Sequence, residues 1–246
     1  MSDLTGKVAL VTGGSRGIGA AIAQKLAADG ADVAITYQNA EVQAKFVVAE
    51  IESRGRRAVA IRADSADAGD VVRAVNQAAA DLGGLDILVN NAGIFPAKPF
   101  EEFTLDEIDR ALNIHARAAF VGAQAAVAHM TGGGRIVSIG SNLSEKASFA
   151  GLSLYNLSKS ALNGFTKALA RELGPRGITV NLLQPGSTVT DMNPLDGGHY
   201  DLQVGLNALG RFAEPEDMAA MVAFLAGETG RNITGSILTV DGGTNA

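Results

Sequence analysis

The stretch Thr12-Gly13-Gly14-Ser15-Arg16-Gly17-Ile18-Gly19 decides the fold class of this 246-residue chain. It lies between a short apolar run at 7–12, which predicts a buried strand, and residues 18–29, whose helical spacing stops at a glycine. Glycines allow a tight turn and let the backbone approach a pyrophosphate closely. The free N–H groups at the start of the helix favour an anion. The stretch therefore predicts a dinucleotide-binding strand-turn-helix unit, and a glycine turn without a ligand is the alternative.

Apolar runs and amphipathic segments alternate along the whole chain. We expect further strands at 32–37, 58–62, 87–90, 135–139, 179–183 and 237–240, and helices at 41–53, 68–82, 104–130, 153–173 and 215–226, of which 104–130 is long enough to bend. Such alternation predicts parallel strands joined by right-handed crossovers. Apolar strands suit a parallel sheet, because helices cover both of its faces. The pattern predicts one doubly wound α/β domain over residues 1–246, with about seven parallel strands.

Residues 187–210 break this rhythm. The segment contains Pro194, Gly197, Gly198, Gly205 and Gly210 and has weak periodicity. A long irregular segment in a compact domain is often a functional lid. It follows the sixth expected strand, at the sheet edge where ligands bind in such folds. We interpret it as a substrate lid, and an ordinary surface excursion is the alternative.

Composition excludes several classes of function. The net charge of −6 disfavours nucleic acid and anionic membranes as partners. The chain has no cysteine, so disulfides, thiolate metal sites and cysteine nucleophiles are excluded. His115, His129 and His199 are scattered, so no metal site is expected. No secretory signal is visible and no segment approaches the ~18 apolar residues of a membrane span. We expect a cytoplasmic protein.

Motifs along the chain support a more specific resemblance. With Thr12, the glycines at 13, 17 and 19 form T-G-x-x-x-G-x-G, and four further motifs follow in order: Asn90-Asn91-Ala92-Gly93, Tyr155-x-x-x-Lys159, Pro185-Gly186 and Val240-Asp241-Gly242-Gly243. In these motifs the chain resembles the short-chain dehydrogenase/reductase family, and within it the 3-oxoacyl-acyl-carrier-protein reductase-like branch. The resemblance covers nearly the whole chain. It implies a Rossmann-type fold, a nicotinamide cofactor and a homotetramer built on helices 104–130 and 153–173.

The end of the second expected strand favours NADP (NADPH) over NAD. An NAD site usually has an acid there, about 20 residues past the glycines, for the ribose 2′-hydroxyl. Here the residues are Thr36-Tyr37-Gln38-Asn39, and Arg16 can supply positive charge for a 2′-phosphate unless it simply faces water. Asp64 is implied to face the adenine, although it could equally cap a helix. The full expected cofactor set is Gly13, Ser15, Arg16, Gly17, Ile18, Gly19, Tyr37, Gln38, Asn39, Asp64, Ser65, Asn91, Ala92, Gly93, Tyr155, Lys159, Pro185, Gly186 and Thr188.

Tyr155 and Lys159 are the strongest catalytic candidates. Four residues apart in a predicted helix, they share one face. A phenol with a pKa near ~10 is a reluctant acid, and a nearby ammonium lowers that pKa. Tyr155 could then act as a general acid towards a carbonyl. The resemblance implies that Lys159 also binds the nicotinamide ribose.

The resemblance adds Ser141 and Asn113 to the catalytic set. Ser141 follows the fifth expected strand and is implied to donate a hydrogen bond to the substrate oxygen. Its spacing to Tyr155 is longer than usual, so Ser144 is a fallback, and strict spacing would select Asn142. Asn113 is implied to bind a water that links Lys159 to solvent, with a locally satisfied helix residue as the alternative.

These residues predict NADPH-dependent reduction of a small ketone, a carbonyl reductase activity. Acyl-carrier-protein reduction is the runner-up, because residues 131–134 are Thr-Gly-Gly-Gly where a basic docking surface would be expected, and only Arg135 and Arg176 remain nearby. A non-catalytic dinucleotide-binding redox sensor is the alternative of another class. Such a sensor would not require Asn113, Ser141, Tyr155 and Lys159 together.

Overall fold

The computed structural model describes residues 3–196 and 198–246. Its strands form one parallel sheet in the order β3-β2-β1-β4-β5-β6-β7. The strands are β1 (Val8–Val11), β2 (Asp32–Tyr37), β3 (Ala58–Arg62), β4 (Ile87–Asn90), β5 (Arg135–Ile139), β6 (Thr179–Pro185) and β7 (Ile237–Val240). The doubly wound fold is confirmed, and β6 runs on to Pro185. The strand order reverses between β1 and β4, which is where a ligand crevice opens in such sheets.

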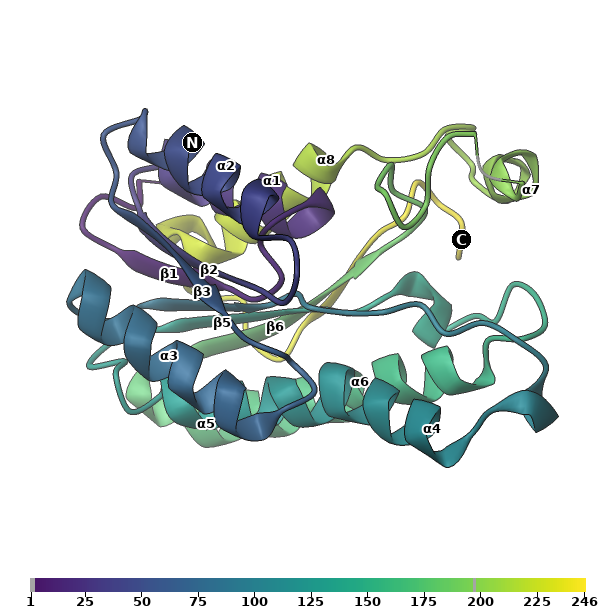
Figure 1. Ribbon diagram of the computed structural model, residues 1–246, viewed down its shortest axis with the longest axis horizontal. Coiled ribbons are helices and arrows are strands. Elements are labelled where there is room, and N and C mark those ends of the chain that lie inside the picture. Colours follow the sequence, from purple (N-terminus) through teal and green to yellow (C-terminus); the bar gives the residue numbers. More distant parts are fainter. Residues whose placement is uncertain (1–2, 197) are drawn as a thin grey trace.

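Helices cover both faces of the sheet (Figure 1). One face carries α1 (Gly17–Ala28), α2 (Glu41–Glu52) and α8 (Pro215–Ala226), and the other carries α3 (Ala68–Leu82), α5 (Ala118–Ala126) and α6 (Ser153–Leu173). Alternate side chains of β1 serve the two layers: Ala9 and Val11 pack in the first core, Val8 and Leu10 in the second. This double burial explains why β1 is apolar throughout. Within residues 3–196 and 198–246, no helix combines the length and apolarity needed to cross a membrane.

The segment expected as one helix at 104–130 is broken into three parts. A capping box between Thr104 and Glu107 starts α4 (Leu105–Leu112), which continues through a π-helical turn, η2 (Asn113–Arg117), into α5. The regular helix ends at Ala126, before the expected boundary at Met130. A π turn inserts an extra residue and often marks a functional site. The expected bend takes this form, and it rotates the residues of η2 relative to those of α4.

The segment 187–210 contains a short helix that periodicity did not reveal. α7 (Tyr200–Gly205) projects away from the sheet at the right of Figure 1. Gly197 lies outside the described residues. Bridges Thr188–Ala213 and Thr190–Asn193 hold the base of the segment. The remaining short helical turns are η1 (Phe100–Glu102), η3 (Asn142–Ser144), η4 (Gly174–Arg176) and η5 (Glu228–Gly230).

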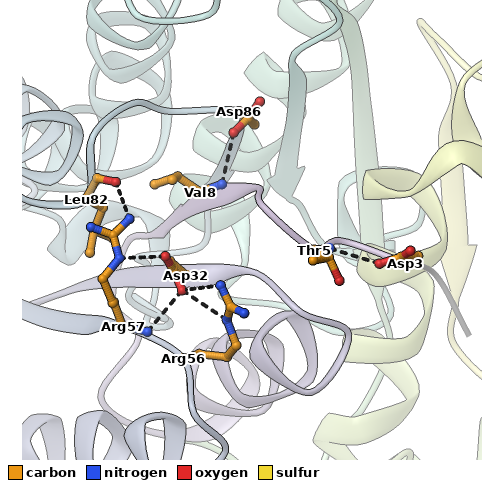
Figure 2. Close-up of polar contacts among 8 residues, drawn as sticks. All are labelled: Asp3, Thr5, Val8, Asp32, Arg56, Arg57, Leu82 and Asp86. Carbon is orange, nitrogen blue, oxygen red and sulfur yellow. Dashed lines mark hydrogen bonds and ion pairs between the residues drawn. The ribbon is translucent and has the colours of Figure 1, made fainter.

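A charged cluster joins the amino-terminal ends of β2 and β3, at the opposite end of the strands from the glycine turn (Figure 2). The Asp32 carboxylate, at the start of β2, accepts hydrogen bonds from Arg56 Nη2 and Arg57 Nε at 2.7 Å each, and from the Arg57 backbone N–H at 3.0 Å. Burial raises the pKa of Asp32, but the hydrogen bonds from Arg57 and Arg56 outweigh it, so the pKa is lowered. The cluster ties the start of β2 to the start of β3. The site lies at the other end of these strands, their carboxyl ends.

Candidate active site

The glycine turn and the loop after β4 approach each other too closely for side chains at Gly13 and Gly19. A Cβ on Gly19 would lie 2.4 Å from both the Gly13 carbonyl oxygen and Asn91 Nδ2. A Cβ on Gly13, whose φ is 64°, would lie 3.0 Å from the Cα of Ala92. The turn after β1 and the loop after β4 therefore meet backbone to backbone, which forms a cradle at the switch point.

Hydrogen bonds fasten these two loops together. Asn91 Nδ2 donates to the carbonyls of Thr12 at 2.8 Å and Gly13 at 3.1 Å. Thr12 Oγ1 accepts from the backbone N–H groups of Asn91 at 2.9 Å and Ala92 at 3.1 Å. The side chain of Asn91, expected to touch the cofactor, holds the turn in shape, and its loop borders the cradle.

The start of α1 offers free donors to an anion. Its N-cap residue, Arg16, is extended with φ −158° and makes no side-chain cap, so the first N–H groups of α1 remain available beside Ser15, Gly17 and Ile18. The exposed Arg16 guanidinium lies 3.7 Å from the carboxylate of Asp191, in the 187–210 segment. Sequence reasoning missed this acidic partner, because nothing local links the two positions.

The ends of β2 and β3 form the expected adenosine side. Asp64 accepts from Gln38 Nε2 at 2.7 Å and from the N–H of Ala66 at 2.8 Å, while Asn39 is exposed and Tyr37 packs against the first core. The cap of α3 is Asp67, which accepts from the N–H of Asp70, so Asp64 is not the helix cap.

Arg62 was missed by the sequence reasoning. It lies opposite Tyr37 in the β2–β3 register, and its Nε donates to the Gln38 carbonyl at 3.2 Å. A positive charge therefore stands beside the residues that follow β2, although none occurs among them in sequence. The β2–β3 register was the only signal that could have located it.

Ser141 and Tyr155 meet at the carboxyl end of β5. Ser141 is buried, its Oγ accepts from the N–H of Leu143 at 3.2 Å, and its hydroxyl acts to lower the pKa of the nearby Tyr155 phenol. The Tyr155 ring is half-buried and packs edge-on against Phe95, with 4.7 Å between the ring centroids. A hydroxyl pair of this kind can bind a carbonyl oxygen and protonate it.

The fallback candidates have other partners. Ser144 Oγ donates to the Ser141 carbonyl at 2.7 Å and accepts from the buried Gln184 Nε2 at 2.8 Å. Asn142 is buried and donates to the carboxylate of Asp241 at 3.3 Å. Both side chains support the loop, so the geometry favours Ser141 among the three.

Lys159 is buried one helical turn beyond Tyr155. Its Nζ donates to the Ile139 carbonyl at 2.8 Å, and burial lowers its pKa to about 8. The pKa of Tyr155 is raised by burial, and the nearby Ser141 hydroxyl opposes that rise only in part. This is opposite to the lowering expected from Lys159. The amine points at the end of β5, and the loss of water around the phenol dominates.

Asn113 opens the π turn and is half-buried. Among the described residues, no hydrogen bond joins its side chain to Lys159, so the water relay stays a prediction. A cavity of about 20 Å³ does border Lys159, with His115 and Asn90 in its wall and Ser65 at its rim. That volume has room for about one water molecule.

The residues after β6 combine structural and binding positions. A Cβ on Gly186 would lie 2.6 Å from the Cα of Asp241, so this glycine is required by the close approach to the end of β7. Thr188 is buried, and its Oγ1 donates to the Gly186 carbonyl at 3.0 Å. Pro185 ends β6 beside Val240. Packing against the end of β7 therefore accounts for Pro185 and Gly186 at these positions. The expected contacts of Pro185, Gly186 and Thr188 with a cofactor stay predictions.

The remaining candidates lie away from the site. The Arg176 guanidinium donates to the carbonyls of Val127 and Met130, at the end of α5, so it is engaged as a helix cap. His129 bonds Asn76 at 2.8 Å, and His199 precedes α7. In the part of the chain that the structure describes, no group of three or more His, Asp or Glu side chains could hold a metal.

Comparison with known proteins places this geometry in a family. A family model described as enoyl-(acyl carrier protein) reductase matches residues 13–245. The cyclic-di-GMP-binding biofilm dispersal mediator protein of Escherichia coli (strain K12) is 42% identical over 246 residues, 100% of both chains. The hydroxynaphthalene reductase-like protein Arp2 of Metarhizium robertsii is also 42% identical, over 98% of this chain and 96% of its own.

Solved structures share the fold. A short-chain dehydrogenase from Burkholderia cenocepacia J2315, in complex with NADP, is 59% identical with a TM-score of 0.98 and covers 99% of this chain and 100% of its own. A blue fluorescent protein from a metagenomic library, in complex with NADPH, is 56% identical with a TM-score of 0.97 over the same shares. The chain belongs to the short-chain dehydrogenase/reductase family of NAD(P)-dependent oxidoreductases.

Proposed function

We propose that the chain is an NADPH-dependent carbonyl reductase acting on a small ketone. The observation that carries this proposal is the pairing of the buried Ser141 hydroxyl, at the carboxyl end of β5, with the Tyr155 phenol, and the buried Lys159 amine one helical turn beyond. A pure binding module would not need this set of groups. The coarser assignment, an oxidoreductase of this family, is the one that the comparisons support directly.

The residues present fit a dinucleotide. The Gly13–Ala92 contact leaves a surface without side chains, and the uncapped start of α1 provides N–H donors for a pyrophosphate. Arg16, with no acid after β2, favours the 2′-phosphate of NADPH, and two of the relatives above were solved with NADP or NADPH. When bound, the cofactor supplies a hydride to the carbonyl carbon.

The chain's own residues act on the carbonyl oxygen. Ser141 donates a hydrogen bond to that oxygen and stabilises the negative charge that develops on it. Tyr155 transfers its phenolic proton to the same oxygen, which completes the alcohol. Lys159 has a pKa of about 8, so its ammonium is present at neutral pH and is available to bind the nicotinamide ribose. The hydride and the proton together supply the two hydrogens that the reduction adds, one on the carbon and one on the oxygen.

Two further parts of the proposal concern the lid and the assembly. Residues 187–210 close over the substrate, with exposed apolar side chains such as Met192 and Leu202 available to meet a ketone. α5 and α6 form the contacts of a homotetramer, because Phe120 and Leu157 expose 55% and 58% of their surface on these helices. Sedimentation of the purified chain tests the second part, and a monomeric mass would contradict it.

Turnover assays test the activity itself. NADPH oxidation is followed with a panel of ketones and an acyl-carrier thioester, for the native chain and for Tyr155→Phe. We expect ketone-dependent oxidation that falls at least about a hundredfold in the variant, because it loses its proton donor. A rate unchanged by the substitution would remove Tyr155 from the mechanism. A preference for the thioester would favour acyl-carrier reduction instead.

A ligand-binding role is the second candidate. The relative from Escherichia coli that matches the whole chain is named for binding cyclic-di-GMP. Calorimetric titration of the chain with cyclic-di-GMP, alone and with saturating NADPH, tests this role. Micromolar binding without any ketone turnover would favour it over the reductase.

A further inference from the structure

We propose that His115 is a positioning residue for the reaction, one that ties the loop after β4 to the helical turn carrying Tyr155. The inference deepens the proposed reductase function and rests on it. His115 is only 3% exposed, lies in the π-helical turn η2 and has no part in the chemistry described above. Its side chain instead connects two segments that border the reacting groups.

Both ring nitrogens of His115 are engaged. Nε2 accepts a hydrogen bond from the backbone N–H of Ile94 at 3.0 Å, and Nδ1 lies 2.8 Å from Ser158 Oγ. Ser158 Oγ donates in turn to the Tyr155 carbonyl at 2.9 Å. Ile94 follows the Asn90–Gly93 loop, and Tyr155 lies in the first turns of α6, so one imidazole joins both sides of the site.

The partners determine the proton position on the ring. The Ile94 N–H can only donate, so Nε2 must carry no proton. The single proton of the neutral ring is then on Nδ1 and is donated to Ser158, whose own hydroxyl proton goes to the Tyr155 carbonyl. Burial, and secondarily the Lys159 ammonium, lower the pKa of His115 to about 2. The direction of all three hydrogen bonds therefore stays the same throughout the working pH range.

The anchored segments are the ones that must be placed accurately. A Cβ on Gly93 would lie 3.3 Å from His115 Nε2 and 3.5 Å from Lys159 Nζ, so the imidazole and the amine both border the space beside this loop. The His115 and Tyr155 rings also meet edge-on, with their centroids 5.9 Å apart. Releasing Ile94 would let Gly93 move against Lys159, and misplacement by about 1 Å can cost about a hundredfold in rate.

A histidine that only filled space would behave differently. Leucine keeps most of the apolar volume but leaves the Ile94 N–H buried without a partner. Glutamine can restore both bonds, because its amide oxygen accepts from Ile94 and its NH₂ donates to Ser158. The pair His115→Leu and His115→Gln therefore separates hydrogen bonding from packing.

The test compares these variants in the ketone assay, with NADPH affinity measured by the fluorescence of the bound cofactor. We expect His115→Leu to lower kcat about ten- to a hundredfold, to change the ketone KM less, and to leave the NADPH Kd within about threefold. His115→Gln should recover most of kcat, and Ser158→Ala should lose several-fold. His129→Leu, in the turn that follows α5 and with its ring bonded to Asn76, is the matched control and should keep the native kcat.

Three outcomes would overturn the inference. They are a native kcat in His115→Leu, equal kcat values in the Leu and Gln variants, or a loss of kcat that is fully explained by a lower Tm. Should His115→Leu fail to fold, Ser158→Ala decides, and a native kcat in that variant has the same consequence. Tyr155→Phe is assayed alongside. If its rate is unchanged, the proposed function fails; if it is inactive while His115→Leu is native, only the positioning role fails.

Discussion

Replacing Gly19 with alanine probes the packing that creates the cofactor cradle. The new Cβ would lie 2.4 Å from Asn91 Nδ2 and 2.4 Å from the Gly13 carbonyl oxygen. The amide could swing away, at the loss of its bonds to Thr12 and Gly13, but the carbonyl belongs to the backbone of the turn. Overpacking of this kind costs about 1–3 kcal/mol.

This strain falls on the surface that must meet the pyrophosphate. Since every ~1.4 kcal/mol is tenfold in affinity, we expect the NADPH Kd to rise roughly fivefold to a hundredfold. Titration of NADPH fluorescence measures the Kd, and thermal unfolding of the free chain reports the strain that remains without ligand. Gly132→Ala is the matched control, because a Cβ there meets nothing within 4 Å. A folded Gly19→Ala chain with native Kd and Tm would refute the reasoning.

Three further outcomes are expected from single groups. Asp32→Asn should lower the free energy of unfolding by about 1–3 kcal/mol at pH 7, measured by urea unfolding. The folded pKa of Asp32 is lowered, so its stabilising contribution is complete above the unfolded pKa of about 3.9 and is lost as pH falls through the folded pKa. The variant should therefore show a smaller fall of Tm at acid pH than the native chain. Asp191→Asn should tighten NADPH binding several-fold and NADH binding less, because it removes a carboxylate 3.7 Å from Arg16, and equal effects on both cofactors, by fluorescence titration, would contradict this. Tyr155 should ionise above the ordinary pKa of a phenol, near ~10, and ultraviolet titration resolves this in a chain with three tyrosines and no tryptophan; its signal must vanish in Tyr155→Phe.

The fold could be predicted because it depends on repeated local signals. Each strand is an apolar run bounded by glycine or polar residues, and the β2 and β3 ranges match the expected 32–37 and 58–62. The π turn in 104–130 could not be predicted, because an inserted residue leaves the apolar spacing of the flanking helix turns nearly intact. α7 was missed because a helix as short as Tyr200–Gly205 is too short to show periodicity.

Contacts between distant segments explain the gaps in the predicted site. Arg62 supplies a charge beside Gln38 through strand register, and Asp191 reaches Arg16 from the 187–210 segment. The sequence around His115 contains no pattern that predicts a role for it. Its role becomes visible only when Ile94 and Ser158 are seen to approach it from opposite sides. None of these pairs is close in sequence, so composition and spacing do not predict these contacts.

The ionisation of the Tyr155–Lys159 pair shows where spacing stops being informative. Four residues along a helix place two side chains on one face, and that expectation concerns the Cβ atoms alone. The Lys159 stem continues to the Ile139 carbonyl, so its amine is held at the end of β5. Burial then raises the pKa of the phenol and lowers that of the amine to about 8. Both shifts disfavour the charged forms of the two groups, so Tyr155 keeps its proton in the resting site. That is the state that the proposed general acid requires. It arises from desolvation, which no spacing rule describes.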